Sequence, residues 1–142
     1  MFLINGVFFQ NQSWMDATLK PGEGMAAVLR AGMFYNLFTG LIRTDEERPW
    51  LFTGGLIDYF GESTLSKITM SSDVFYFTKK YDRRQDLIEY RFKLRGNNLW
   101  VGGYSGPVTG AGLAKCYLTE VPETFLSPAD DFEPFGEPSV PF

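Results

Sequence analysis

The sequence predicts an all-β fold: a single antiparallel up-and-down β-barrel of about eight strands, followed by an irregular, acidic, proline-rich C-terminal tail. Three observations lead to this prediction. Hydrophobic residues make up 44% of the 142 residues and aromatic residues 17%, a composition that excludes a disordered chain. Fifteen glycines and eight prolines provide the turns that many short strands need. Short runs of alternating polar and apolar residues fill the middle of the chain, as expected for half-buried strands.

The clearest strand covers residues 87–94, where Ile88, Tyr90 and Phe92 occupy one face of a period-two pattern. The polar residues 82–86 join it to a run at 74–81, which predicts a hairpin. Gly96, Asn97 and Asn98 form a turn signal because Gly and Asn tolerate positive φ. Six consecutive strands are therefore predicted, and their short connections favour antiparallel neighbours. They cover residues 50–60, 64–71, 74–81, 87–94, 99–104 and 111–119.

The two ends of the chain have different characters. Residues 1–10 predict a first strand and residues 20–24 a turn. Between residues 25 and 42 both helical and strand periods fit, and the β-rich run at 34–38 favours two strands over a helix. Past residue 121, prolines and acidic residues replace the strand pattern. We expect a barrel domain over 1–121 and an extended tail over 122–142, partly docked through its scattered phenylalanines.

The reactive side chains exclude most catalytic classes. The chain contains no histidine and a single cysteine, Cys116, which removes the common nucleophile triads, zinc sites and redox pairs. We expect no catalytic residue, metal or cofactor, and we expect Cys116 to be a buried, inert thiol. An enzyme that uses carboxylates such as Asp58 or Glu62, or a Tyr/Lys pair, is the alternative, although Asp58 fits better as an acid that caps the turn before Gly61. The lone cysteine and the lack of a signal peptide or apolar span predict a cytoplasmic protein without a membrane segment.

The net charge of -4 is unevenly distributed. Residues 79–95 carry seven basic and three acidic side chains, whereas residues 120–142 carry six acidic and no basic ones. A basic hairpin suggests nucleic-acid binding, but such a cluster is more often a solvated rim, and the chain as a whole is acidic. We therefore expect no nucleic-acid partner.

The motif Trp100-x-Gly102-x-Tyr104-x-Gly106, followed by Leu118-Thr119, resembles the seventh-strand region of avidin-type barrels. More loosely, it is similar to the calycin group, which includes lipocalins and fatty-acid-binding proteins. The resemblance implies that Trp100 forms a wall of a ligand site. The other biotin-contacting positions of avidins have no match, so biotin binding is not implied.

A second similarity is to the last strand of the fatty-acid-binding proteins, which carries an Arg-x-Tyr carboxylate clamp. Lys115-Cys116-Tyr117 takes a comparable place in this chain. Lysine offers a point charge where arginine offers a planar fork. If the face shared by Lys115 and Tyr117 is the interior of the barrel, Lys115 needs an anionic ligand or a carboxylate partner.

These features predict a non-enzymatic binding module that holds a small apolar or amphipathic ligand inside the barrel. The candidate lining residues are Trp100, Tyr104, Tyr90, Phe92, Phe77, Lys115 and Tyr117. The alternative is a solid barrel, plugged by Trp100, that acts as a protein-interaction or oligomer-assembly module through its C-terminal tail or its outer aromatic surface. The volume of the cavity inside the barrel separates the two.

Overall fold

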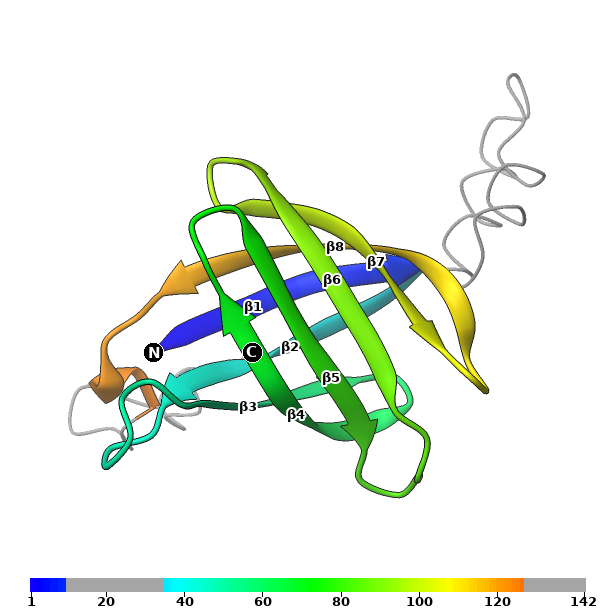
Figure 1. The fold of residues 1–142 in the computed structure, drawn as a ribbon, viewed down its shortest axis with the longest axis horizontal. Coiled ribbons are helices and arrows are strands. Elements are labelled where there is room, and N and C mark those ends of the chain that lie inside the picture. The colour runs from blue at the N-terminus through cyan, green and yellow to red at the C-terminus, as the bar shows by residue number, and fades with distance from the viewer. Residues whose placement is uncertain (10–34, 127–142) are drawn as a thin grey trace, which may run out of the picture.

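Eight antiparallel strands close into a barrel in a computed structural model, which describes residues 1–9 and 35–126 (Figure 1). Each strand pairs with its neighbours in the sequence, and β1 pairs with β8 to complete the ring. The predicted all-β, up-and-down barrel is confirmed. The strands are β1 (Phe2–Phe9), β2 (Tyr35–Thr44), β3 (Phe52–Asp58), β4 (Gly61–Met70), β5 (Val74–Tyr81), β6 (Ile88–Gly96), β7 (Leu99–Gly106) and β8 (Gly110–Glu120), followed by a 3-10 helix, η1 (Glu123–Leu126).

The ambiguous segment at 25–42 is described only in its last part. From Tyr35 the chain is the strand β2, as the β-rich run predicted. Its earlier residues belong to 10–34, which lie outside the described residues, as does the tail from 127 onward. The boundary between a barrel domain and a tail stays a prediction.

The turn between β6 and β7 lies where the sequence places it. Gly96, Asn97 and Asn98 have φ values of 131°, 52° and 65°, in the left-handed region that Gly and Asn adopt at low cost. Lys67 also has a positive φ, 52°, at a bulge where the register of β4 against β5 shifts. The predicted turn at Gly61 lies slightly earlier, at residues 59–60, and Gly61 begins β4.

The strands bury their inner face in a core that is dominated by aromatic rings. Phe75 lies 5.6 Å from Phe92 and 5.9 Å from Trp100, measured between ring centroids. Phe77 stacks on Tyr90 at 5.0 Å. All five residues are at most 6% exposed. Contacts of this kind add to the hydrophobic gain of burial, and they fill the middle of the barrel with side chains.

The two ends of the barrel differ. One end, which we call the tyrosine end, carries the loops at residues 59–60, 82–87 and 107–109. At the opposite end the backbone N–H of Val121 donates to the carbonyl oxygen of Met1 at 2.9 Å. There the amino group of Met1 also lies 3.6 Å from Glu123 of η1. No helix in the described ranges has the length and apolar character needed to cross a membrane.

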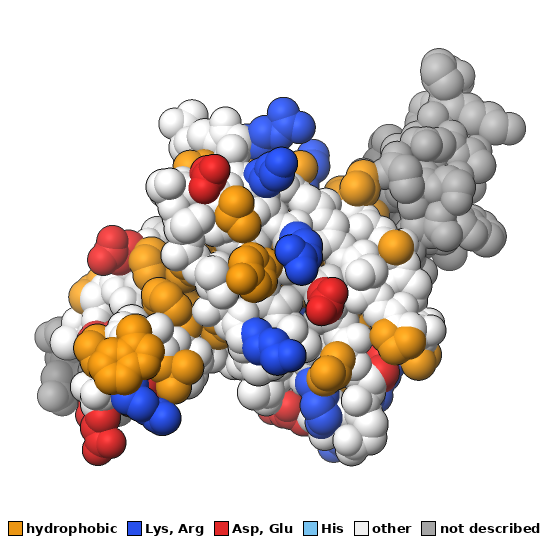
Figure 2. All heavy atoms as spheres, in the orientation of Figure 1, with side chains coloured by type: hydrophobic (Ala, Val, Ile, Leu, Met, Phe, Trp, Pro, Cys, Tyr) orange, Lys and Arg blue, Asp and Glu red, His pale blue; other side chains and the backbone are white. Residues whose placement is uncertain are grey.

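The basic residues of 79–95 do not form one cluster. Arg91 and Lys93 project outward from β6, and the guanidinium of Arg91 lies over the ring of Tyr76 at 5.3 Å. Figure 2 shows Lys and Arg side chains spread over this face of the molecule, with apolar, acidic and uncharged groups between many of them. Lys79, which the sequence groups with this rim, is completely buried.

Candidate functional site

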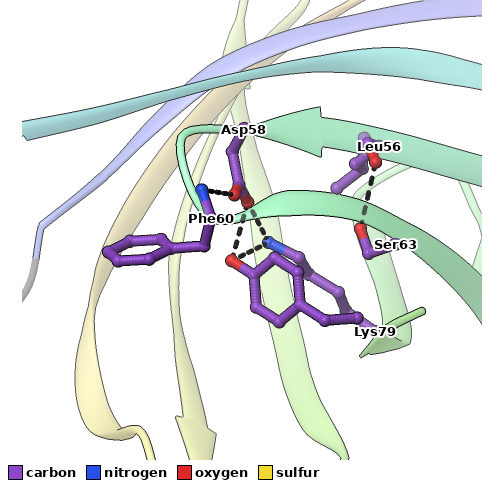
Figure 3. A network of polar contacts seen from close by, with 6 residues as sticks. Leu56, Asp58, Phe60, Ser63 and Lys79 are labelled. Carbon is purple, nitrogen blue, oxygen red and sulfur yellow. Dashed lines mark hydrogen bonds and ion pairs between the residues drawn. The ribbon is translucent and has the colours of Figure 1, made fainter. Parts of the chain in front are cut away.

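A buried ion pair lies inside the barrel near the tyrosine end (Figure 3). The ammonium of Lys79 on β5 is 2.6 Å from the Oδ2 atom of Asp58, the last residue of β3, and neither side chain is exposed. The hydroxyl of Tyr81 donates to the same oxygen at 2.7 Å, and Lys79 donates to the Tyr81 hydroxyl at 2.9 Å. The backbone N–H of Phe60 donates to Oδ1 at 2.8 Å. Asp58 therefore caps the turn, as expected, and also compensates a buried charge.

Aromatic rings surround the ammonium of Lys79. It lies 4.3 Å from the ring centroid of Tyr81, 5.2 Å from that of Phe8 and 5.5 Å from that of Tyr90. Burial lowers the pKa of Lys79, and the hydrogen bond to Asp58 opposes that shift. Interaction with ring faces and with the carboxylate makes an ammonium tolerable at this depth.

A pocket of about 310 Å³ opens at the tyrosine end; we call it the tyrosine pocket. Two of its walls are the rings of Tyr90 and Tyr104, stacked at 5.5 Å, and Phe8 meets Tyr104 edge-on at 5.7 Å. Its volume is at the lower end of the range for small-molecule sites, and its walls are mainly apolar, as such sites require. The lining residues are Phe8, Phe60, Tyr81, Arg84, Ile88, Tyr90, Tyr104, Val108 and Thr109.

The three tyrosines of the pocket differ in their hydrogen bonds. The Tyr81 hydroxyl is bound to Asp58, and the Tyr104 hydroxyl donates to the carbonyl oxygen of Phe9. Within the described ranges the Tyr90 hydroxyl makes no hydrogen bond. Burial raises the pKa of Tyr81, Tyr90 and Tyr104. All three phenols therefore stay protonated near neutral pH.

The residues expected to line a ligand site lie in three places. Tyr90 and Tyr104 line the tyrosine pocket. Phe77, Phe92 and Trp100 are buried in the aromatic core and are not among the residues lining that pocket.

Lys115 and Tyr117, the other two expected lining residues, lie on the outer face of β8 beside a groove. Cys116 between them is buried and points inward. Burial raises the pKa of its thiol, in keeping with an inert side chain.

Sequence reasoning missed the ion pair and the rim of the pocket, which includes Phe60 and Arg84. A signal for Lys79 was present: Phe75, Phe77, Lys79 and Tyr81 alternate with the outer residues of one strand, so the period-two pattern places all four side chains inside. Nothing in the local sequence identifies its partner on β3.

The carboxylate and the ammonium of the ion pair are bound to each other and to Tyr81, and neither side chain is exposed. Each compensates the charge of the other inside the barrel. No cluster of three or more potential metal ligands occurs in the portion of the chain that the structure covers. Fold and site define a closed eight-stranded barrel with an aromatic pocket at one end.

Comparisons with protein-family models, curated proteins and solved structures give no match to this chain. The closed antiparallel barrel is consistent with the calycin-like architecture that the Trp100 motif suggested. The fold class therefore rests on the geometry of the chain itself.

Proposed function

We propose that this protein is a non-enzymatic binding module that holds a small amphipathic ligand in the tyrosine pocket. The observation that carries the proposal is a pocket of about 310 Å³ with aromatic walls, into which an unbonded phenol projects. An apolar part of the ligand would pack against Phe60 and Val108, while a polar part would meet the Tyr90 hydroxyl. Such a combination of apolar walls and few polar groups is typical of small-molecule sites.

The proposed site lies at the end of the barrel, not in its centre, where the sequence predicted an enclosed ligand. Phe75, Phe92 and Trp100 occupy that centre and pack on one another. A ligand placed there would have to displace buried rings, each of which contributes about 1.5–3 kcal/mol through its burial. We therefore place the ligand at the end of the barrel, above this core.

The proposal is tested with prodan, a neutral naphthyl ketone whose fluorescence reports binding. Val108 is 72% exposed at the rim of the pocket, and Leu37 is 73% exposed on the outer face of β2. We expect Val108→Trp to fill the pocket and weaken binding by about tenfold or more, which corresponds to about 1.4 kcal/mol. The matched control, Leu37→Trp, should bind as the wild type does. Equal binding by the wild type and Val108→Trp would refute the assignment, and so would a loss confined to Leu37→Trp.

A second candidate function is oligomer assembly through the outer surface or the C-terminal tail. It is favoured by the groove on the outer face of β1, β2, β7 and β8, which is lined by Val7, Leu37, Leu99 and Tyr117. Leu37 and Tyr117 are 73% and 51% exposed there. Exposed apolar groups of this kind are typical of contact surfaces. Light scattering on Leu37→Lys and on a chain lacking Ser127 to Phe142 tests this candidate, because an unchanged mass in both variants would exclude it.

A further inference from the structure

The charged side chains at the tyrosine pocket are already paired within the protein. Arg84 donates from Nε and Nη2 to the two carboxylate oxygens of Asp86, each at 2.8 Å. Lys79 below the pocket is bound to Asp58. A ligand carboxylate would lose its water without gaining an unpaired cation, and a ligand ammonium would gain no unpaired carboxylate. Burial of a charge without such a partner is strongly unfavourable.

The ring faces that could hold a cationic ligand also have occupants. The ring of Tyr81 has the ammonium of Lys79 at 4.3 Å and the guanidinium carbon of Arg84 at 5.6 Å. Tyr90 stacks between Phe77 and Tyr104. These rings already interact with cations or with other rings. The pocket therefore does not provide an aromatic cage for a quaternary ammonium.

What remains for recognition is a set of flat apolar walls and the Tyr90 hydroxyl. Tyr90 is 2% exposed, and within the described ranges its hydroxyl is unbonded although it borders the pocket. A phenol is protonated near neutral pH, so the Tyr90 hydroxyl has a hydrogen to donate. A ligand oxygen in the pocket would accept this hydrogen in place of water and form one neutral hydrogen bond.

We propose that the tyrosine pocket selects an uncharged, planar aromatic ligand that presents a carbonyl or similar oxygen to the Tyr90 hydroxyl. This inference rests on the proposed function and specifies the chemical class of the ligand. The half-exposed ring of Phe60, which lines the pocket, offers an apolar face to a flat molecule. The pocket volume suits about two or three fused rings. The oxygen distinguishes such a ligand from a simple hydrocarbon.

The test uses four probes that share one ring system: naphthalene, acetonaphthone, naphthoate and naphthylmethyl-trimethylammonium. Their dissociation constants are measured by titration calorimetry with the full chain. We expect the wild type to bind acetonaphthone about five- to tenfold more tightly than naphthalene, the gain of one neutral hydrogen bond. We expect both charged probes to bind about tenfold or more weakly than the ketone, because neither finds an unpaired partner.

Two variants assign the preference to one atom. Tyr90→Phe should abolish the advantage of the ketone over naphthalene while leaving naphthalene binding unchanged. This variant should fold, since it removes a hydroxyl that is not bonded to any described residue. Tyr117→Phe is the control: it removes a hydroxyl on the outer face of β8, away from the pocket, and the preference for the ketone should survive.

The outcomes separate this inference from the proposed function. If naphthoate or the ammonium probe binds as tightly as the ketone, or if Tyr90→Phe keeps the ketone preference, the inference is overturned. The proposed function still stands in that case, provided that Val108→Trp blocks the probes. If none of the four probes binds, both are overturned.

Discussion

The buried ion pair gives the most direct test of the energetics of this barrel. In Asp58→Asn the ammonium of Lys79 loses a carboxylate oxygen at 2.6 Å while both side chains remain inaccessible to water. The amide keeps an oxygen for the backbone N–H of Phe60, so the turn at the end of β3 is retained. The amide nitrogen then takes the place of Oδ2, which accepts from Lys79 and Tyr81. The substitution therefore removes the negative charge and both of these hydrogen bonds.

The expected loss follows from what surrounds Lys79. Removing one member of a buried pair typically costs 3–5 kcal/mol. The ring faces of Phe8, Tyr81 and Tyr90 continue to stabilise the ammonium, at about 0.5–2 kcal/mol. We therefore expect Asp58→Asn to lower the free energy of unfolding by about 3 kcal/mol at pH 7.

The pH dependence of the variant has a definite sign. Burial lowers the pKa of Lys79, and the substitution removes the Asp58 interaction that opposes this shift. Between the folded pKa and the unfolded value of about 10.4, the unfolded chain binds more protons than the folded one. The stability of Asp58→Asn should therefore rise from pH 7 to 9, more steeply than that of the wild type and by at most about 1.4 kcal/mol per pH unit.

Urea unfolding, followed by tryptophan fluorescence, measures both effects. The control is the double variant Asp58→Asn/Lys79→Met, which contains neither charge and should recover to within about 1 kcal/mol of the wild type. A loss below about 1 kcal/mol in the single variant would contradict the reasoning, as would a double variant no more stable than the single one.

Three further predictions concern stability. Because burial raises the pKa of Tyr90, the folded protein keeps a proton that the unfolded chain releases above about pH 10, and stability should fall there by up to about 1.4 kcal/mol per pH unit. Tyr90→Phe should make this decline in the urea midpoint shallower; an unchanged decline would exclude Tyr90 as its source. Gly6→Ala places a methyl group too close to the carbonyl oxygen of Lys115 and to the ring of Phe38, and it should cost about 3 kcal/mol. Gly55→Ala, whose nearest contact is the carbonyl oxygen of Ser63 at 3.2 Å, should cost about 1 kcal/mol or less. Similar urea midpoints for the two glycine variants would show that the space at Gly6 is not needed. Asn36 buries an amide nitrogen without a hydrogen-bond partner among the described residues, so Asn36→Leu should raise stability by about 1 kcal/mol, and a lower thermal midpoint would contradict this.

Most of the fold could be predicted from the sequence because a barrel of this type is built from local patterns. The hairpin of β5 and β6 follows from period two and a polar linker, and the β6–β7 turn follows from Gly96, Asn97 and Asn98. Pairing between sequence neighbours then gives the meander. Closure of β1 on β8 joins residues more than a hundred positions apart, and only the strand count suggested it.

The site was harder to predict from the sequence because its residues are far apart along the chain. The strand pattern places Lys79 inside, but the carboxylate that makes this position tolerable is 21 residues away in the chain. Whether Trp100 borders a cavity or packs in a core depends on the summed volume of side chains from all eight strands, which no single motif determines. The side chains of Lys115 and Tyr117 share a face, as expected, and only the closed barrel shows that it is the outer one.

The pairing of β1 with β8 affects how the chain folds during its synthesis. β8 leaves the ribosome after the other strands, so until then the edges of β1 and β7 have no partner. Unpaired edges can join other chains, and long-range pairing slows folding. Completion of β8 should therefore be the step that protects the nascent protein from aggregation. A chain that ends before Gly110 should depend on chaperones in a way that a chain extended through Glu120 does not.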